Sequence, residues 1–293
     1  MMRISDSMIF RQMSQGIQTT QQRSYESQRK AMSGLRVEKP SDDPAAAHRG
    51  VLLESQKRQL DSMKRNSATA FNELATTDSA LSSVTDLLHQ IRERLIQGLN
   101  DTNTAEDRAH IATDITALKD EILAIANTKV GDVYIFSGYA TTTEPFQADG
   151  TFLGITGSRQ AEVAPGVTVD LNVSGDSVFA PATGTNLFAT IDQMVLDMQG
   201  GDTAAMATRL DDMDTLQEQV LNSRVSVGST LAQVERSDQT REELALFINQ
   251  SQETAVGLDQ AESYVDLVAN QHALTSAIAQ ARRVLEQLQQ PLF

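Results

Sequence analysis

Hydrophobic residues recur at alternating intervals of three and four along much of the chain. This spacing places them on one stripe of an α-helix, as in coiled coils. A helix from about Pro44 to Leu99 would be roughly 80 Å long at about 1.5 Å per residue. It cannot cover its own stripe, so it needs partner helices from the same chain or from other copies. The longest run comprises Leu60, Met63, Ser67, Ala70, Leu74, Thr77, Leu81, Val84, Leu88, Ile91 and Leu95.

Three further stretches show related spacing. A second run follows the polar breaker NDTNTAED, and a third extends from Tyr264 to Leu292. Between residues 203 and 255 the spacing is looser, because Arg224, Asp238 and Arg241 interrupt it. The second run is Ile111, Ile115, Leu118, Ile122 and Ile125, and the looser one is Leu210, Met213, Val220, Val227, Leu231 and Val234. Together the runs predict a mainly α fold with a helical body at 44–129 and 190–256.

Residues 130–189 have a different composition from the rest of the chain. Eight of the sixteen glycines lie there, together with seven of the thirteen aromatic residues. The segment VTVDLNV alternates strictly between apolar and polar residues, and VYIF is β-branched and aromatic, which is typical of strands. We therefore predict a small β domain inserted into the helical body, with an aromatic core of its own.

The segment SGLRVEKPSDDP, residues 33–44, interrupts the helical pattern and is called the spoke below. Gly34 suits a left-handed helix C-cap, and Pro40 forces the preceding residue toward an extended conformation. Asp43 followed by Pro44 is a helix N-cap followed by a favoured first residue. The spoke therefore ends one helix and begins the next, and a hinge explains it without catalysis. Its predicted residues are Gly34, Leu35, Arg36, Pro40, Asp42, Asp43 and Pro44.

The two ends of the chain are predicted to form single helices, one in residues 1–43 with the spoke and one in 257–293. Asp259, with Glu262 three residues later, marks the start of the second. Each helix has one apolar face and little else to pack on, so we expect the two faces to meet and to contact other subunits. The expected contact residues are Ile4, Met8, Met13, Ile17, Leu267, Leu274, Ile278, Leu285 and Leu288.

Composition and motifs argue against catalysis and against metal or cofactor binding. The formal charge of −15 argues against nucleic-acid binding, and the absence of cysteine excludes disulfides and thiol catalysis. No stretch is apolar enough for a membrane span, and the four histidines have no metal-ligand spacing. Asp42 and Asp43 could bind a cation, although capping explains them better. We expect no catalytic residue, no metal and no cofactor, and an enzyme would need a site hidden in the insert.

Three motifs together resemble the flagellin superfamily: MRIS at 2–5, MSGLRVEKPSDDPAAA at 32–47 and YIFSGYATTTEPF at 134–146. The third motif favours the hook–filament junction proteins of that superfamily over the flagellins of the filament. Its residues here are Tyr134, Phe136, Gly138, Tyr139 and Phe146.

The resemblance implies an elongated helical bundle in which both terminal helices form the inner layer of a tubular assembly and the spoke leads to the next layer. It also implies secretion through the flagellar export channel, and a place in the flagellum at the hook–filament junction. The implied partners are hook-associated protein 1, flagellin, neighbouring copies and an export chaperone at residues 258–293. Two other interpretations remain open: a filament flagellin, and a cytoplasmic coiled-coil signalling or regulatory protein.

Overall fold

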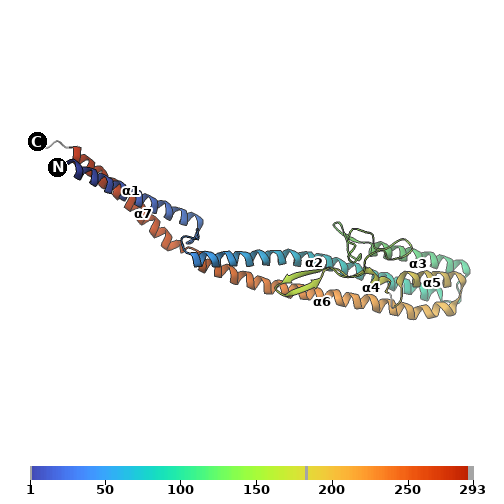
Figure 1. Cartoon of the computed structure of the whole chain (residues 1–293). Coiled ribbons are helices and arrows are strands. Elements are labelled where there is room, and N and C mark those ends of the chain that lie inside the picture. Colours follow the sequence, from blue (N-terminus) through green and yellow to red (C-terminus); the bar gives the residue numbers. More distant parts are fainter. Residues whose placement is uncertain (1, 182–183, 290–293) are drawn as a thin grey trace. The chain divides into compact units, whose positions relative to one another are not determined.

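The computed structural model describes residues 2–181 and 184–289, with side chains described for 8–181 and 184–286. Helices dominate it, and two small antiparallel sheets pair β1 with β2 and β3 with β4 (Figure 1). The mainly α fold with a small β insertion is therefore confirmed. No helix in the described part of the chain is long and apolar enough to cross a membrane. The elements are α1 (Met2–Ser33), α2 (Pro44–Gly98), α3 (Ala105–Ala126), β1 (Lys129–Val130), β2 (Val133–Tyr134), β3 (Gln160–Ala164), β4 (Val167–Asp170), α4 (Gly175–Phe179), α5 (Leu187–Gly200), α6 (Thr203–Val256) and α7 (Gln260–Gln289).

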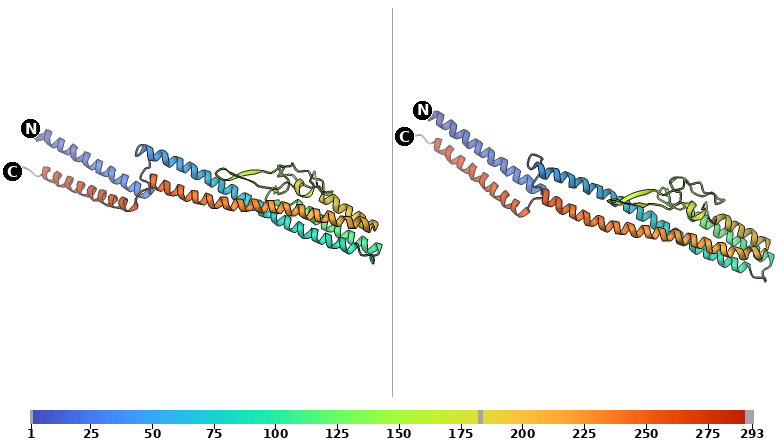
Figure 2. Two further views of the ribbon diagram at one scale, coloured as in Figure 1. Left: turned by 90° about the horizontal axis from the view of Figure 1, so that it is seen from below. Right: turned by 60° about the horizontal axis from the view of Figure 1, so that its bottom comes forward.

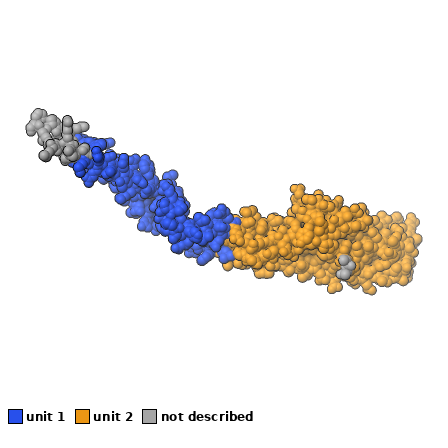
Figure 3. Space-filling view, in the orientation of Figure 1, with its two compact units in different colours: residues 1–58, 244–293 blue, residues 59–243 orange. Residues whose placement is uncertain are grey.

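The chain divides into two compact units, coloured separately in Figure 3. Unit 1 comprises residues 1–58 and 244–293, and unit 2 comprises residues 59–243. Within unit 1, α1 and α7 lie side by side (Figures 1 and 2). The charge is divided unevenly, because unit 2 has 12 Lys and Arg against 28 Asp and Glu, whereas unit 1 has 12 against 11. Unit 2 therefore carries a formal charge of −16 and unit 1 a charge of +1.

The core of unit 2 is built on the long heptad run of α2. Every member of that run from Leu60 to Leu95 is buried, including the small polar residues Ser67 and Thr77. Helices α3, α5 and α6 supply the facing apolar residues. The polar interruptions predicted in α6 are paired here, since Arg224 contacts Asp78 on α2 at 3.3 Å. A helix with partners on several sides can bury its whole stripe, which explains why this part of the pattern was easy to predict.

The insert does not have the separate core that its composition suggested. Its buried residues, among them Phe136, Phe146 and Phe179, belong to one continuous hydrophobic cluster with α2, α3, α5 and α6. Phe188 on α5 packs against Phe146 with ring centroids 5.4 Å apart. The insert also ends earlier than residue 189, because α5 begins at Leu187. Asn186 caps that helix by accepting the N–H of Ala189 at 3.0 Å.

Candidate functional site

The spoke has the helix-ending and helix-starting geometry that its sequence predicted. Gly34 has a φ of 68°, and its N–H donates to the Lys30 carbonyl at 2.9 Å, which closes α1. At the other end the Asp43 carboxylate accepts the N–H groups of Ala45 and Ala46 at 3.1 and 3.0 Å. Pro44 is the first residue of α2, where a missing N–H costs nothing.

Backbone hydrogen bonds link the spoke to the short segment that connects α6 to α7. The Arg36 N–H donates to the Val256 carbonyl at 2.8 Å, and the Leu258 N–H donates to the Gly34 carbonyl at 3.1 Å. The Arg36 guanidinium also donates to the Ala255 carbonyl at 2.9 Å. Leu35 forms a bridge with Gly257 between these bonds. The two connecting segments thus form a short antiparallel pair, and the hydrogen bonds between them hold the spoke in place.

The acidic residues of the spoke act as hydrogen-bond acceptors. The Ser33 hydroxyl donates to Glu38 at 2.7 Å, and this bond, with the Arg29 ion pair, lowers the pKa of Glu38. The Asp42 carboxylate accepts the Lys39 N–H at 3.1 Å, and backbone donors lower the pKa of Asp42. The N-cap bonds of Asp43, that from Ala46 above all, lower its pKa as well. These partners account for both aspartates, and the described residues hold no cluster of three candidate metal ligands.

The interface between α1 and α7 differs from the predicted stripe on α7. Leu267 and Leu274 are half-buried as expected, but Tyr264 is exposed and Ile278 remains 39% exposed. The predicted stripe includes Tyr264, Leu267, Gln271, Leu274, Ile278, Ala281 and Leu285, and at every second position the covered residue lies one place earlier: Ser263, Asn270, Ala277 and Val284. The covered α7 residues are Ser263, Leu267, Val268, Asn270, Leu274, Ala277, Ala281 and Val284; on α1 they include Met13, Ile17, Thr20, Ser24 and Ser27.

The two sets of α7 residues share Leu267, Leu274 and Ala281, so they lie on adjacent sides of one helix. Helix α1 covers only one side. A polar bond marks its register, because the Asn270 side-chain amide donates to the Ser27 hydroxyl at 2.6 Å. The other side of α7, with Ile278 and Leu285, is left exposed.

The predicted contact residues near the chain ends fall into two groups. Met13 and Ile17 line a cavity of ≈ 250 Å³ between α1 and α7, so they contribute to contact within the chain. Met8 is largely exposed, as is its neighbour Phe10, which the sequence reasoning did not select. Ile4 and Leu288 lie outside the residues whose side chains the structure describes.

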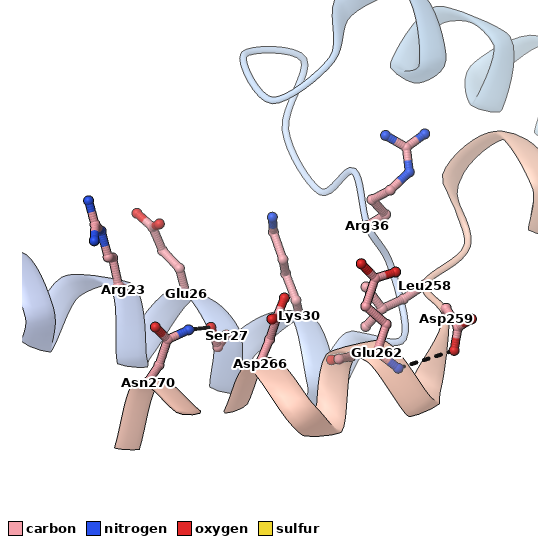
Figure 4. A pocket seen from close by; sticks show the side chains of 11 residues that line it. Arg23, Glu26, Ser27, Lys30, Arg36, Leu258, Asp259, Glu262, Asp266 and Asn270 are labelled. Carbon is pink, nitrogen blue, oxygen red and sulfur yellow. Dashed lines mark hydrogen bonds between the residues drawn. The ribbon is translucent and has the colours of Figure 1, made fainter. Parts of the chain in front are cut away.

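Beside the spoke, α1 and α7 enclose a small polar pocket of ≈ 280 Å³, shown in Figure 4. Its lining mixes charges of both signs: the cations are Arg23, Lys30 and Arg36, and the carboxylates are Glu26, Asp259, Glu262 and Asp266. Asp259 accepts the N–H groups of Ala261 and Glu262 at 2.9 and 3.3 Å, which confirms the predicted N-cap of α7. The pocket is therefore a charged end of the helix pair, with four carboxylates and three cations in its lining.

The third sequence motif forms part of the core of unit 2. Phe136 and Phe146 are buried, and Gly138 has a φ of 66°. A Cβ at Gly138 would lie 1.8 Å from the Ile155 carbonyl oxygen, so only glycine fits there. Tyr134 is half-buried under Lys129, whose ammonium lies 4.3 Å from the ring centroid, and Tyr139 is exposed.

Asn127, which the sequence reasoning missed, anchors this motif. Its side-chain amide donates to the Phe146 carbonyl at 2.9 Å and accepts the Phe146 N–H at 3.0 Å. Asn127 also follows the last turn of α3, so it connects the insert to the helical body. An asparagine after a helix usually signals only a cap, which is why its second role is not evident from sequence.

Comparisons with known proteins agree with this architecture. The family described as "Bacterial flagellin N-terminal helical region" matches residues 4–141. Flagellar hook-associated protein 3 of Escherichia coli is 29% identical over 94% of this chain and 95% of its own length. The protein of that name from Salmonella typhimurium is 32% identical over 62% of this chain and 58% of its own.

Among solved structures, Bacillus cereus FlgL superimposes with a TM-score of 0.60 at 23% identity, covering 69% of this chain and 99% of its own. At that identity the likeness concerns the fold. Several flagellins also match, over 34% to 78% of the chain.

Proposed function

We propose that the chain is a member of the flagellin superfamily and a structural axial protein that joins the hook-associated region of the bacterial flagellum to the flagellin filament. The observation that carries this proposal is the extent of the match to a hook-associated protein 3, which covers 94% of this chain and 95% of that protein. Flagellins match between 34% and 78% of the chain. A protein that contacts both the hook-associated region and the flagellin filament needs the terminal helices that it shares with flagellins and an outer part that differs from theirs.

The proposed mechanism is non-covalent assembly through the terminal helices. The side of α7 that α1 leaves exposed, with Ile278 and Leu285, supplies apolar surface for a neighbouring subunit. Burial of such surface stabilises contacts by about 25 cal/mol per Å². The Arg36 and Leu258 hydrogen bonds of the spoke then fix where α1 and α7 are attached to α2 and α6. The proposed role is structural and involves no catalysis.

The partners follow from the junction role. At its two faces the protein would meet hook-associated protein 1 and flagellin, and around the ring it would meet copies of itself. Secretion through the flagellar export channel would precede assembly. Before secretion an export chaperone would cover residues 258–293, because an apolar helix side without its final partner needs protection.

Deletion of the gene in its own bacterium tests the proposal. We expect electron micrographs to show hooks without filaments, and the medium to contain abundant soluble flagellin. Cells that lack filaments and also secrete no flagellin would identify the chain as the flagellin itself. Normal motile filaments would refute the structural role and favour the cytoplasmic coiled-coil interpretation.

A further inference from the structure

The first part of α2 and the last part of α6 form an apolar groove in unit 1. Among the described residues 47–58 and 244–255, Ile248 is the only buried side chain. Two helices by themselves cannot enclose a core, so Leu52 and Phe247 remain more than half exposed. They line a groove of ≈ 630 Å³ whose single charged residue is Arg49. The groove also contains the neutral polar residues Gln56, Gln250, Ser251 and Thr254, so its lining favours a mainly apolar occupant with negative charge nearby.

A second exposed apolar surface lies on the insert of unit 2. Tyr139, Leu153 and Ile155 are each about half exposed. They are neighbours, because the Tyr139 N–H donates to the Ile155 carbonyl at 2.9 Å and residues 153 and 155 alternate along one extended segment. Phe152, between them in the chain, turns inward and packs on Phe146 with ring centroids 5.2 Å apart. We call Tyr139, Leu153 and Ile155 the insert patch.

Two carboxylates lie near the insert patch. Asp176 accepts the Thr156 hydroxyl at 2.9 Å, next to Ile155. Glu144 precedes Pro145, whose carbonyl accepts the Leu153 N–H at 2.7 Å, and its carboxylate accepts the Asn127 amide at 3.0 Å. Residues 130–189 contain six carboxylates and one cation, Arg159, which is already paired with Glu73. The insert patch is therefore apolar in an acidic part of the chain, whereas the one charged residue that lines the groove is the cation Arg49.

We infer that the groove of one copy binds the insert patch of a second copy. Apolar surface and opposite charge match in this arrangement. Two different patches that pair between identical molecules make a heterologous contact, which repeats around a ring or along a helical array. The inference rests on the proposed structural role and adds a second contact to that of the terminal helices.

Engineered cysteines test the contact, because the chain has none of its own. Two versions of the full chain, Gln56→Cys and Leu153→Cys, are expressed together in the bacterium without its native copy. After oxidation of isolated flagella, we expect at least tenfold more disulfide-linked heterodimer than from Gln56→Cys with Ser229→Cys, an exposed position outside the patch. Equal yields would overturn the inference.

A matched pair of substitutions tests the role of the groove. Phe247→Glu places a charge in it, whereas Leu246→Glu changes an equally exposed neighbour that does not line it. We expect Phe247→Glu to reduce both cross-linking and incorporation at least tenfold, and Leu246→Glu to leave both unchanged. The same effect from both variants would refute a specific contact.

The occupant is identified with p-benzoylphenylalanine at position 247, followed by mass spectrometry of cross-linked peptides. Peptides from residues 139–156 of another copy support the inference, and peptides from any other protein overturn it. If even the wild-type chain is absent from flagella, the proposed function fails together with this contact. If the wild-type chain is present without the cross-link, only this contact fails.

Discussion

Ile278→Glu separates assembly from folding more sharply than any other substitution in the terminal helices. Ile278 is 39% exposed on the side of α7 that α1 does not cover. Leu274, one turn earlier, is half-buried against α1. A charge at Leu274 therefore disturbs the chain's own helix pair as well as any contact between copies, whereas a charge at Ile278 disturbs the contact between copies alone.

The size of the effect follows from burial. Complete burial of an isoleucine side chain contributes about 1.5–3 kcal/mol, so covering the exposed part of Ile278 contributes about 1 kcal/mol. A buried carboxylate without a partner costs about 3 kcal/mol more. The sum of about 4 kcal/mol lowers the association constant roughly a thousandfold at about 1.4 kcal/mol per tenfold. In the isolated chain the change is expected to be much smaller, because a carboxylate at this partly exposed position can reach solvent.

The assay compares Ile278→Glu with Ile278→Leu, which keeps the apolar volume, and with Leu274→Glu. Helical content and thermal unfolding are measured on purified chains, and incorporation is measured by immunoblot of isolated flagella. We expect Ile278→Glu to keep the wild-type melting curve and to lose incorporation, while Ile278→Leu keeps both. Normal incorporation of Ile278→Glu would show that this side of α7 faces solvent in the assembly. A loss of helix equal to that in Leu274→Glu would refute the assignment of the two sides.

Three further outcomes follow from the geometry. Phe146→Ala removes a buried ring and should lower the free energy of unfolding by about 3–5 kcal/mol, measured by denaturant titration. Gly138→Ala places a methyl group against a backbone carbonyl at positive φ, so proteolysis should begin within the insert well before the wild type is cut. The pKa values of Glu38, Asp42 and Asp43 are lowered in the folded chain. Their stabilisation is thus present above their ordinary pKa and lost as pH falls, and spoke amides should exchange hydrogen faster, relative to an unfolded reference, at pH 3 than at pH 6.

The sequence predicted the helical body well because unit 2 surrounds the long α2 run with other helices. Residues such as Ser67 and Thr77 could be assigned to the interior by spacing alone, and they are buried. The capping residues Gly34 and Asp43 were predictable for a similar reason, since their effect depends only on neighbouring backbone atoms. Sequence patterns predict the structure reliably in two cases: where a side chain bonds to nearby backbone, as in a helix cap, and where a helix is surrounded by other helices.

Prediction was less accurate where the buried side of an element depended on residues far away in the sequence. Two sets of α7 positions fit a heptad equally well, and hydrophobicity favoured the one with Ile278 and Leu285. The structure pairs α1 with the adjacent set, in which the Asn270 side-chain amide donates to the Ser27 hydroxyl of α1. The aromatic residues of the insert posed the same difficulty. Their clustering in sequence suggested a separate core, but Phe188 and the Asn127 amide join them to the helices.

The composition of the terminal pair explains why its apolar side faces outward. Its own interface contains Thr20, Ser24, Ser27 and Ser263, which bury little apolar area. Residues 12–22 and 267–281 contain no Asp, Glu, Lys or Arg, although 22% of the chain is charged. A helix with one side in water would normally place charges there. Their absence around the full circumference is expected for helices enclosed by other helices. We therefore expect the pair to be weakly stabilised alone and to bury further apolar surface against neighbouring subunits.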